Sequence, residues 1–289
     1  MAGPRLFAKP KGKPKINGFA LDDEILGEGT FSSVYRAQHI QTGTPVAIKV
    51  IDMTKQNKNK CENEKDIMLL LNKAPNTVQL FASSKLSDSQ FVLVMTLAVC
   101  GSLLDWLANK DFMYMERQID IMLGTITAVA YMHDHQIMHR DIKPENILLN
   151  EVFQPLVSDF GLTRYIADDN LKTEPMAGSP AYMAPEILLE YGEYSQHSDV
   201  FAFCKTFQQV FLRSIEGPHA DVDSLEDLKH KMAAGGHQEA MPDVKQCPKR
   251  LTNLLRWGLT WTSTERPSAG LIKDVITEFK DEINLMMTL

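Results

Sequence analysis

The chain has 289 residues, of which 44% are hydrophobic and 23% are charged, as in an ordinary globular protein with one large or two modest lobes. Its net charge of −7 is unevenly distributed, because residues 1–15 carry five basic and no acidic residues and the rest carries 25 basic against 37 acidic residues. The acidic body argues against broad nucleic-acid binding, and four scattered cysteines without a CxxC pair argue against a zinc site or a disulfide framework.

The first segment, residues 1–15, combines proline, glycine and lysine without apolar periodicity, so we expect a disordered basic arm. It would serve as a solvated tail, a localisation signal or a contact for an anionic partner. The longest apolar run, Phe91–Cys100, is far shorter than the ~20 residues of a membrane span, and no apolar signal-peptide core is visible. We therefore expect no membrane span and a reducing compartment, cytoplasmic or nuclear or both.

The next part of the chain has the pattern of β-strands, with apolar and β-branched runs at Ile25–Leu26, Val34–Tyr35 and Val46–Ile48. Gly27 and Gly29 lie between the first two runs, and their missing Cβ atoms would let backbone amides fold closely over phosphate groups. Taken alone, two glycines between strands favour an ordinary turn.

One helix and two further strands are expected over the rest of the first hundred residues, and helices dominate from about Leu103. Residues 55–60 are interpreted as a polar connector, helical periodicity begins near Cys61, and residues 215–248 are expected to form loops and one helix. The other predicted elements are strands at Val78–Phe81 and Phe91–Met95, helices at Leu103–Ala108, Glu116–His135 and Leu251–Leu259, and a final helix opened by Thr264–Ser268.

The candidate chemistry is concentrated in His139–Asn146, which reads HRDIKPEN, and in the Asp-Phe-Gly sequence that begins at Asp159. Asp141 precedes Asn146 by five residues, and Asp159 follows thirteen residues later. One loop and one turn can therefore supply a base and two hard oxygen ligands, which is the equipment for transferring a phosphoryl group held on Mg²⁺.

These motifs resemble the catalytic loop and metal-binding turn of the eukaryotic protein kinases, whose signature also includes the VAIK string ending at Lys49 and the APE string ending at Glu186. The resemblance covers residues 19–280. It implies an α+β fold of two lobes: a small antiparallel β-sheet with one main helix, and a mostly helical second lobe. The implied boundaries are 1–15 for the arm, 16–95 for the N-lobe, 96–102 for the hinge and 103–289 for the C-lobe, with an activation segment at 159–186.

The resemblance implies that ATP and Mg²⁺ bind between the lobes and that the γ-phosphate passes to a serine or threonine hydroxyl of a protein substrate. Asp141 would orient that hydroxyl, and Lys143 would neutralise charge on the γ-phosphate. Asn146 and Asp159 would bind Mg²⁺. A lysine two residues after the aspartate is typical of the serine/threonine type.

Lys49 would contact the α- and β-phosphates and would pair with an acid on the neighbouring helix. Glu62 and Glu64 are the candidates, and two residues apart on a helix they face different ways. Glu64 shares its face with Met68 and Leu71, so we assign the ion pair to Lys49 and Glu64 and expect Glu62 to be a solvated surface acid.

The nucleotide contacts implied by the resemblance lie in the glycine-containing hairpin, the next strands, the hinge and the catalytic loop. Met95 would be the gatekeeper beside the adenine, Ala98 would bond the adenine through its backbone, and Leu148 would form the floor opposite. Ser32 replaces the family's third glycine, which predicts altered loop mobility rather than lost binding. The full set is Leu26, Gly27, Glu28, Gly29, Thr30, Phe31, Ser32, Ser33, Val34, Ala47, Lys49, Met95, Ala98, Asn146, Leu148 and Asp159.

The polar segment between the DFG and APE strings resembles an activation segment whose order is switched by phosphate. Thr173 is the first candidate acceptor, with Tyr165 and Thr163 behind it, although Pro175 stands where many relatives have the acceptor. Arg140 would recruit the phosphate, which an upstream kinase or a second copy of the chain would supply.

Several other residues are expected to support the site rather than to react. Ser179 replaces a threonine that contacts Asp141 and Lys143 in the family, and Asp199 would accept hydrogen bonds from the catalytic-loop backbone. The remaining expectations are an ion pair between Glu186 and Arg266, a packed His139, and His133 and His135 as surface or helix-end histidines.

Two other functions compete with a serine/threonine protein kinase. A pseudokinase or scaffold would use the fold for binding alone, but such proteins usually lack the equivalents of Lys49, Asp141 or Asp159, and all three are present. A small-molecule kinase is disfavoured because a segment ending in APE serves the docking of polypeptides.

Overall fold

The computed structural model describes residues 14–29, 31–54, 58–107, 109, 114–167, 176–238 and 241–288. Its chain divides into two compact units, one formed by Met1–Cys61 with Leu80–Leu97 and the other by Glu62–Gln79 with Ala98–Leu289. Thr30, Thr173, Pro175 and most of the basic arm lie outside the described residues.

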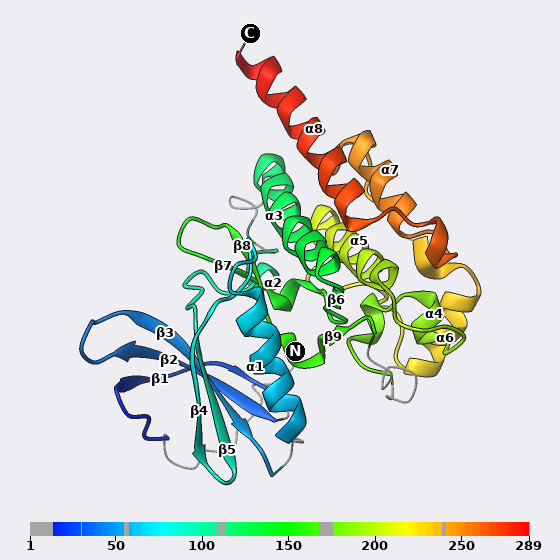
Figure 1. Ribbon diagram of the computed structural model, residues 1–289. Helices are drawn as coiled ribbons and strands as arrows, with labels where there is room; N and C mark the ends of the chain where they lie inside the picture. Colours follow the sequence, from blue (N-terminus) through cyan, green and yellow to red (C-terminus); the bar gives the residue numbers. More distant parts are fainter. Residues whose placement is uncertain are drawn as a thin grey trace. The chain divides into compact units, whose positions relative to one another are not determined.

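The first unit is built on one antiparallel five-stranded sheet in the order β1-β2-β3-β5-β4 (Figure 1). Adjacent strands follow one another in sequence except at β3-β5, where β5 separates β3 from β4. The strands are β1 (Phe19–Glu28), β2 (Ser32–His39), β3 (Pro45–Asp52), β4 (Leu80–Ser87) and β5 (Gln90–Met95).

One hydrophobic cluster of this unit lies on one face of the sheet. Strand side chains alternate between faces, so β-branched residues two apart on β3 and β5 point to the same side and pack together. The cluster comprises Ile16, Tyr35, Ala37, Val46, Ile48, Val50, Val92 and Val94.

The expected strand at Val78–Phe81 is displaced in the structure. Strand β4 begins at Leu80, and Val78 belongs to the second unit, where its amide donates to the carbonyl of Val157 at 3.0 Å. The polar connector expected over residues 55–60 is also shorter, because the helix already begins at Lys58.

The second unit is mostly helical. The helices α3, α5 and α8 lie side by side and form its centre (Figure 1). Its helices are α1 (Lys58–Leu71, of which the part from Glu62 belongs here), α2 (Leu103–Trp106), α3 (Met115–Asp134), α4 (Pro185–Leu188), α5 (Gln196–Leu212), α6 (Leu225–Ala233), α7 (Lys249–Gly258) and α8 (Ala269–Thr288).

Two short antiparallel ribbons carry the loops that connect these helices. Strand β6 (Ile137–Met138) pairs with β9 (Arg164–Tyr165), and β7 (Ile147–Leu149) pairs with β8 (Pro155–Val157). The segment His139–Asn146 therefore runs from one ribbon to the other.

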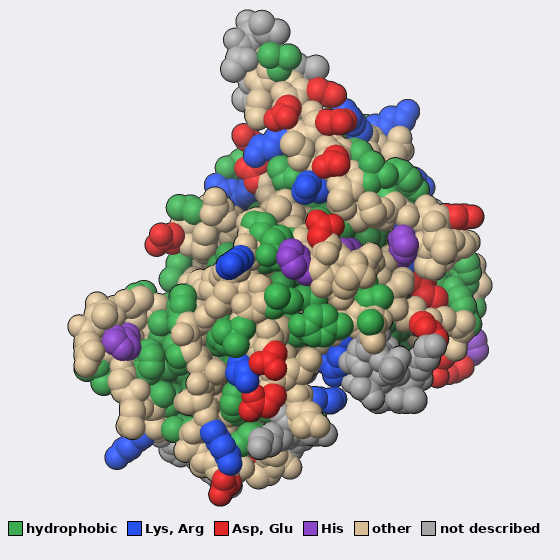
Figure 2. All heavy atoms as spheres, in the orientation of Figure 1, with side chains coloured by type: hydrophobic (Ala, Val, Ile, Leu, Met, Phe, Trp, Pro, Cys, Tyr) green, Lys and Arg blue, Asp and Glu red, His purple; other side chains and the backbone are tan. Residues whose placement is uncertain are grey.

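Acidic and basic side chains are mixed on the surface around α8 (Figure 2). Arg250 bonds Glu282 at 2.7 Å and Glu278 at 3.0 Å, and Lys280 bonds Asp120 at 2.5 Å. Within the described residues, no helix is both long enough and apolar enough to cross a membrane.

Candidate active site

The segment His139–Asn146 is held on helix α5 by one buried carboxylate. Asp199 Oδ2 accepts from the amide of His139 and Oδ1 accepts from the amide of Arg140, both at 2.8 Å. Arg140 adopts a positive φ of 72°, a left-handed conformation that most side chains avoid. The two hydrogen bonds to the Asp199 carboxylate help to hold this strained backbone. The role predicted for Asp199 is confirmed.

Helix α3 adds a third contact to the same carboxylate. His133 lies 3.0 Å from Asp199 Oδ2 through its Nε2 atom. It stands in the last turn of α3, in agreement with a helix-end histidine, but it is only 7% exposed and therefore does not belong to the surface. Burial alone would raise the pKa of Asp199, but the hydrogen bond and charge of His133, together with His139 and the Arg140 amide, lower it. The periodicity around His133 gave no sign of this contact, because its partner lies 66 residues away.

The Asp141 carboxylate has two oxygens in different surroundings. Oδ2 lies 2.9 Å from Nδ2 of Asn146 and 3.1 Å from Nζ of Lys143. Oδ1 is buried and receives no hydrogen bond from the described residues. A buried acceptor without a donor is unusual, and a carboxylate oxygen in this state can accept a hydrogen bond from a further group.

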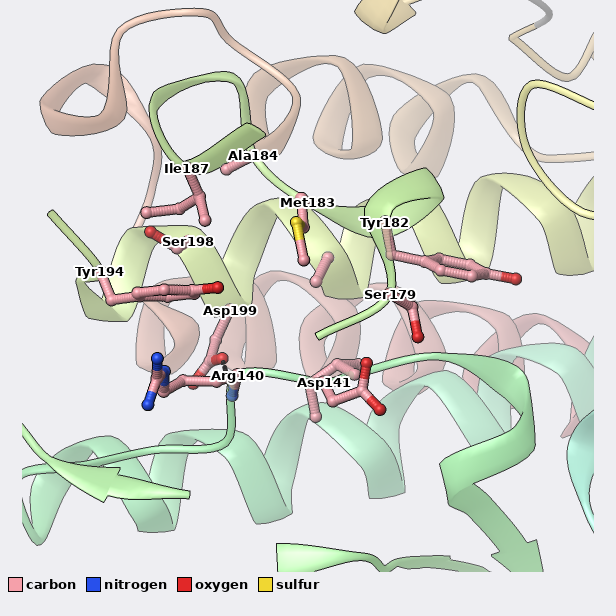
Figure 3. Close-up of a pocket in the computed structure, with 12 residues that line it drawn as sticks. Arg140, Asp141, Ser179, Tyr182, Met183, Ala184, Ile187, Tyr194, Ser198 and Asp199 are labelled. Carbon is pink, nitrogen blue, oxygen red and sulfur yellow. Dashed lines mark hydrogen bonds between the residues drawn. The ribbon is translucent and has the colours of Figure 1, made fainter. Parts of the chain in front are cut away.

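Lys143 links this carboxylate to the segment that precedes the APE string. Its Nζ donates to Ser179 Oγ at 2.7 Å as well as contacting Asp141, which agrees with the contact expected of Ser179. Figure 3 shows Ser179 and Asp141 extending toward one another from different segments.

Asn146 and Asp159 present oxygen atoms of the kind that Mg²⁺ prefers. Among the described residues, both hydrogen bonds of the Asn146 side-chain amide use Nδ2, to the backbone oxygen of Asp141 at 2.8 Å and to its carboxylate at 2.9 Å. The amide oxygen is of the kind that a cation would bind. Asp159 is exposed and adopts a left-handed φ of 61°. The described residues contain no cluster of three His, Cys, Asp or Glu side chains, but Mg²⁺ usually takes one or two protein ligands and completes its shell with water and substrate phosphates. The donor chemistry therefore fits this ion.

Glu64 lies close to the same turn. A Cβ placed on Gly161 would meet Asp159 Oδ1 at 3.5 Å and Glu64 Oε2 at 3.6 Å, so both carboxylates flank one glycine. Glu64 is 2% exposed, whereas Glu62 is partly exposed and pairs with Lys65. The orientations expected of the two acids are those observed.

The glycine-containing hairpin and Lys49 lie in the first unit. Gly27 pairs with Val34 and Glu28 with Ser33 across strands β1 and β2, and the Gly29 amide donates to the carbonyl of Ser32 at 2.8 Å. Leu26 and Phe31 expose apolar side chains on either side of the turn of the same hairpin.

The other residues expected around the nucleotide fall into two groups. In the first unit, Val34 pairs with Lys49 and Ala47 with Met95, so these four residues occupy neighbouring positions of strands β2, β3 and β5. In the second unit, Leu148 lies on β7 and forms a bridge with Ser102. Ala98 also belongs to the second unit.

Two of the three candidate phosphate acceptors lie in the described residues. Thr163 is completely buried and its hydroxyl donates to the carbonyl of His139 at 3.4 Å, so a kinase could reach it only after this segment opened. Tyr165 is 41% exposed.

The APE string is fixed by the expected ion pair. Arg266 donates to both carboxylate oxygens of Glu186 at 2.7 Å, and both side chains are buried. His139 is buried as well, and its Nε2 lies 2.9 Å from the carbonyl of Ser158, in agreement with a packing role.

Two further contacts near the site were missed by sequence reasoning. Asn63 donates from α1 to the carbonyl of Thr163 at 3.1 Å, and Tyr194 lies against Arg140. Each joins segments far apart in the chain through a residue that belongs to no recognisable motif.

The amino-acid sequence is similar to those of known proteins. The protein kinase domain family matches residues 21–277. The chain is 31% identical over 217 residues to serine/threonine-protein kinase pakF of Dictyostelium discoideum, covering 74% of the chain and 18% of that protein. It is 32% identical over 226 residues to serine/threonine-protein kinase PLK4 of Xenopus laevis, covering 76% and 23%. A third relative, the carbon catabolite-derepressing protein kinase of Saccharomyces cerevisiae, is 37% identical over 170 residues, covering 57% and 26%. The chain thus spans about a fifth to a quarter of the length of these relatives.

Proposed function

The chain belongs to the protein kinase family, and we propose that it transfers the γ-phosphate of ATP to serine or threonine hydroxyls of protein substrates. The observation that carries this proposal is the Asp141 carboxylate, in which Oδ2 is held by Lys143 and Asn146 while the buried Oδ1 receives no hydrogen bond from the described residues. A substrate hydroxyl would supply the donor that Oδ1 lacks.

Positioning is the larger part of the task assigned to Asp141. Bond breaking to the leaving phosphate runs ahead of attack in a loose transition state, so little proton transfer is required before the hydroxyl reacts. Asp141 would therefore orient the hydroxyl and then accept its proton. Lys143, 3.1 Å from Asp141, would neutralise charge on the γ-phosphate oxygens.

Mg²⁺ bound to Asn146 and Asp159 would neutralise charge on the phosphates of ATP. We assign the phosphate contacts of the first unit to Lys49 and to the backbone amides of Gly27–Gly29. Glu64, buried beside Gly161, would pair with Lys49 in the active form. Met95, Ala98 and Leu148 would contact the adenine.

The serine/threonine preference rests on two observations. Lys143 stands two residues after Asp141 and bonds Ser179, and the relatives pakF and PLK4 are named as serine/threonine-protein kinases. Phosphorylation of Thr173 by an upstream kinase or by a second copy would order the activation segment through Arg140. The four cysteines are free thiols, which is compatible with a reducing compartment such as the cytoplasm or nucleus.

A peptide array with labelled ATP and Mg²⁺ tests the proposal. Label should appear on serine and threonine peptides and be absent from matched peptides with alanine or tyrosine at the acceptor position. A protein that binds nucleotide but labels no peptide would instead be a binding module.

A further inference from the structure

Tyr194 occupies a position between the catalytic loop and the segment that precedes the APE string. It lies just before α5, is partly buried, and lines a small pocket together with Arg140, Asp141 and Ser179 (Figure 3). The proposed reaction gives it no part as a base, a metal ligand or a nucleotide contact.

The aromatic ring of Tyr194 contacts the residue immediately before Asp141. The guanidinium carbon of Arg140 lies 4.1 Å from the centroid of the ring, and Figure 3 shows the ring over this side chain. A guanidinium stacked on an aromatic face in a partly desolvated site is attracted to the negative face of the ring. The ring therefore restrains Arg140 from the side chain, while Asp199 restrains it through the backbone amide.

The hydroxyl of Tyr194 contacts a different segment. It donates to the carbonyl of Ala177 and accepts from the amide of the same residue at 3.2 Å. Burial raises the pKa of the Tyr194 phenol, so the group stays protonated and keeps both bonds at neutral pH. One hydroxyl thus satisfies both backbone groups of Ala177.

The residue after Ala177 lies directly against the catalytic loop. A Cβ on Gly178 would come within 2.6 Å of the Arg140 carbonyl and 3.6 Å of Asp141 Oδ1, and its φ is +113°. Only glycine fits this approach without strain. The next residue, Ser179, accepts the hydrogen bond from Lys143 at 2.7 Å.

We propose that Tyr194 is a positioning residue for the phosphoryl transfer: its ring fixes Arg140 and its hydroxyl fixes Ala177, so that Gly178 and Ser179 are held against Asp141 and Lys143. This inference rests on the proposed kinase function. The segment Ala177–Ser179 then forms one wall of the space in which the acceptor hydroxyl must approach Asp141 Oδ1. Tyr194 acts through these neighbours and touches no reacting atom.

The variants Tyr194→Phe and Tyr194→Leu separate the role of the ring from that of the hydroxyl. Phenylalanine keeps the ring over Arg140 and loses the hydroxyl with both of its bonds to Ala177, whereas leucine loses the ring as well. With a serine peptide, kcat should fall roughly tenfold for Tyr194→Phe and roughly a hundredfold for Tyr194→Leu, because a small misplacement of reacting groups has effects of this size. The KM for ATP should change less than about twofold, since the nucleotide contacts are untouched.

Two further measurements distinguish positioning from a merely structural role. Tyr194→Phe should have little added effect on kcat in a Ser179→Ala background, because the hydroxyl acts through Ser179 and coupled residues are not additive. Hydrogen exchange of residues 176–183 should be faster in Tyr194→Phe than in the unaltered protein. Tyr191→Phe is the matched control, because Tyr191 is 54% exposed, stacks on Trp261 and does not line the pocket beside Arg140 and Asp141.

Each outcome has a defined meaning. Unchanged hydrogen exchange at residues 176–183 would overturn the inference whatever the activity. A Tyr194→Phe protein as active as the unaltered protein would overturn it while leaving the kinase function intact. If the unaltered protein transferred no phosphate to any peptide, the proposed function and the inference would both fail.

Discussion

The two oxygens of Asp141 determine what a single substitution there should do. An asparagine introduced at position 141 could still accept hydrogen bonds from Asn146 and Lys143 through its side-chain oxygen. Its NH₂ group, at the position of Oδ1, could neither take up a proton nor carry a negative charge. We expect Asp141→Asn to lower the rate of phosphate transfer by about 10²–10⁴-fold, the usual contribution of a positioned acid or base. Nucleotide binding, measured by calorimetry with an ATP analogue, should persist.

The control for this variant is Asp134→Asn, because Asp134 is exposed at the end of α3. Its rate should match that of the unaltered protein. Turnover retained by Asp141→Asn at more than about a tenth of the normal rate would contradict the role given to this carboxylate.

Residues with a regular spacing could be placed from the sequence, and residues with a long-range partner could not. Glu64 was distinguished from Glu62 because helical periodicity alone decides which acid faces inward. The contacts of His133, Asn63 and Tyr194 depend on partners in other segments, and periodicity carries no information about which segments meet. The positive φ at Arg140 and Asp159 was equally invisible, since neither residue is a glycine.

At the scale of elements, the side chain of Asn63 joins helix α1 to the turn after Asp159. Asn63 Nδ2 donates to the carbonyl of Thr163 at 3.1 Å, while the Thr163 hydroxyl bonds the catalytic-loop residue His139. Because Glu64 follows Asn63 directly, this bond fixes where the Glu64 carboxylate lies beside Gly161. We expect Asn63→Ala to lower kcat several-fold and the free energy of unfolding by about 1 kcal/mol, the net contribution of one hydrogen bond.

Steady-state kinetics and denaturant unfolding would measure both effects. Asn72→Ala provides the comparison, because Asn72 follows the last turn of the same helix and lies eight residues beyond Glu64. Equal kcat values for the two variants would show that Asn63 does not position Glu64.

Element boundaries were predicted well where a pattern was long and poorly where it was short. The helix expected over Glu116–His135 is α3 at Met115–Asp134, because twenty residues display several turns of one apolar stripe. Strands of two or three residues, such as β6 and β7, offer no period to detect. The strand expected at Val78–Phe81 begins two residues late, at Leu80, because Val78 bonds the backbone of Val157 instead. A short apolar run is compatible with either arrangement.

At the scale of the whole molecule, one buried arginine joins the loop before α8 to the end of the activation segment. Arg266 has five N–H groups, and the structure gives an acceptor to each: two oxygens of Glu186 and the carbonyls of His197, Thr260 and Trp261. Lysine has one nitrogen and cannot reproduce this planar arrangement. We expect Arg266→Lys to lower the free energy of unfolding by about 3–5 kcal/mol, as when a buried ion pair is broken from one side.

Arg250→Lys is the matched control, because Arg250 pairs with Glu278 and Glu282 at the surface, where ion pairs contribute about 0–1 kcal/mol. Urea unfolding of both variants would measure the difference. A loss of under about 1 kcal/mol for Arg266→Lys would mean that the charge alone, rather than the geometry of the guanidinium, holds this contact.

Stability should also decline as the solution is acidified below neutrality, because two histidines of the second unit have lowered pKa values. Burial is the main cause of the lowered pKa for both His197 and His237; the charge of Arg266 contributes to both, and Lys205 contributes at His237. An unfolded histidine takes up its proton near pH 6.5, whereas these two do so only at lower pH in the folded protein. Between these values the unfolded state binds more protons, so stability falls as the pH drops from about 7 toward 5.5.

Both imidazoles keep contact with solvent, which screens the charge and keeps the effect small. We expect His197→Gln and His237→Gln each to reduce the fall in Tm between pH 7.5 and 5.5 by about 2 °C relative to the unaltered protein. His230→Gln is the control, because its side chain is 75% exposed on α6 and lies 3.5 Å from the equally exposed Glu226. An exposed pair of this kind contributes only about 0–1 kcal/mol. The buried Asp199 carboxylate does not disturb this measurement, because with its lowered pKa it affects stability only near pH 4 and below. Identical pH profiles for His197→Gln, His237→Gln and the unaltered protein would show that the acid sensitivity arises at other groups.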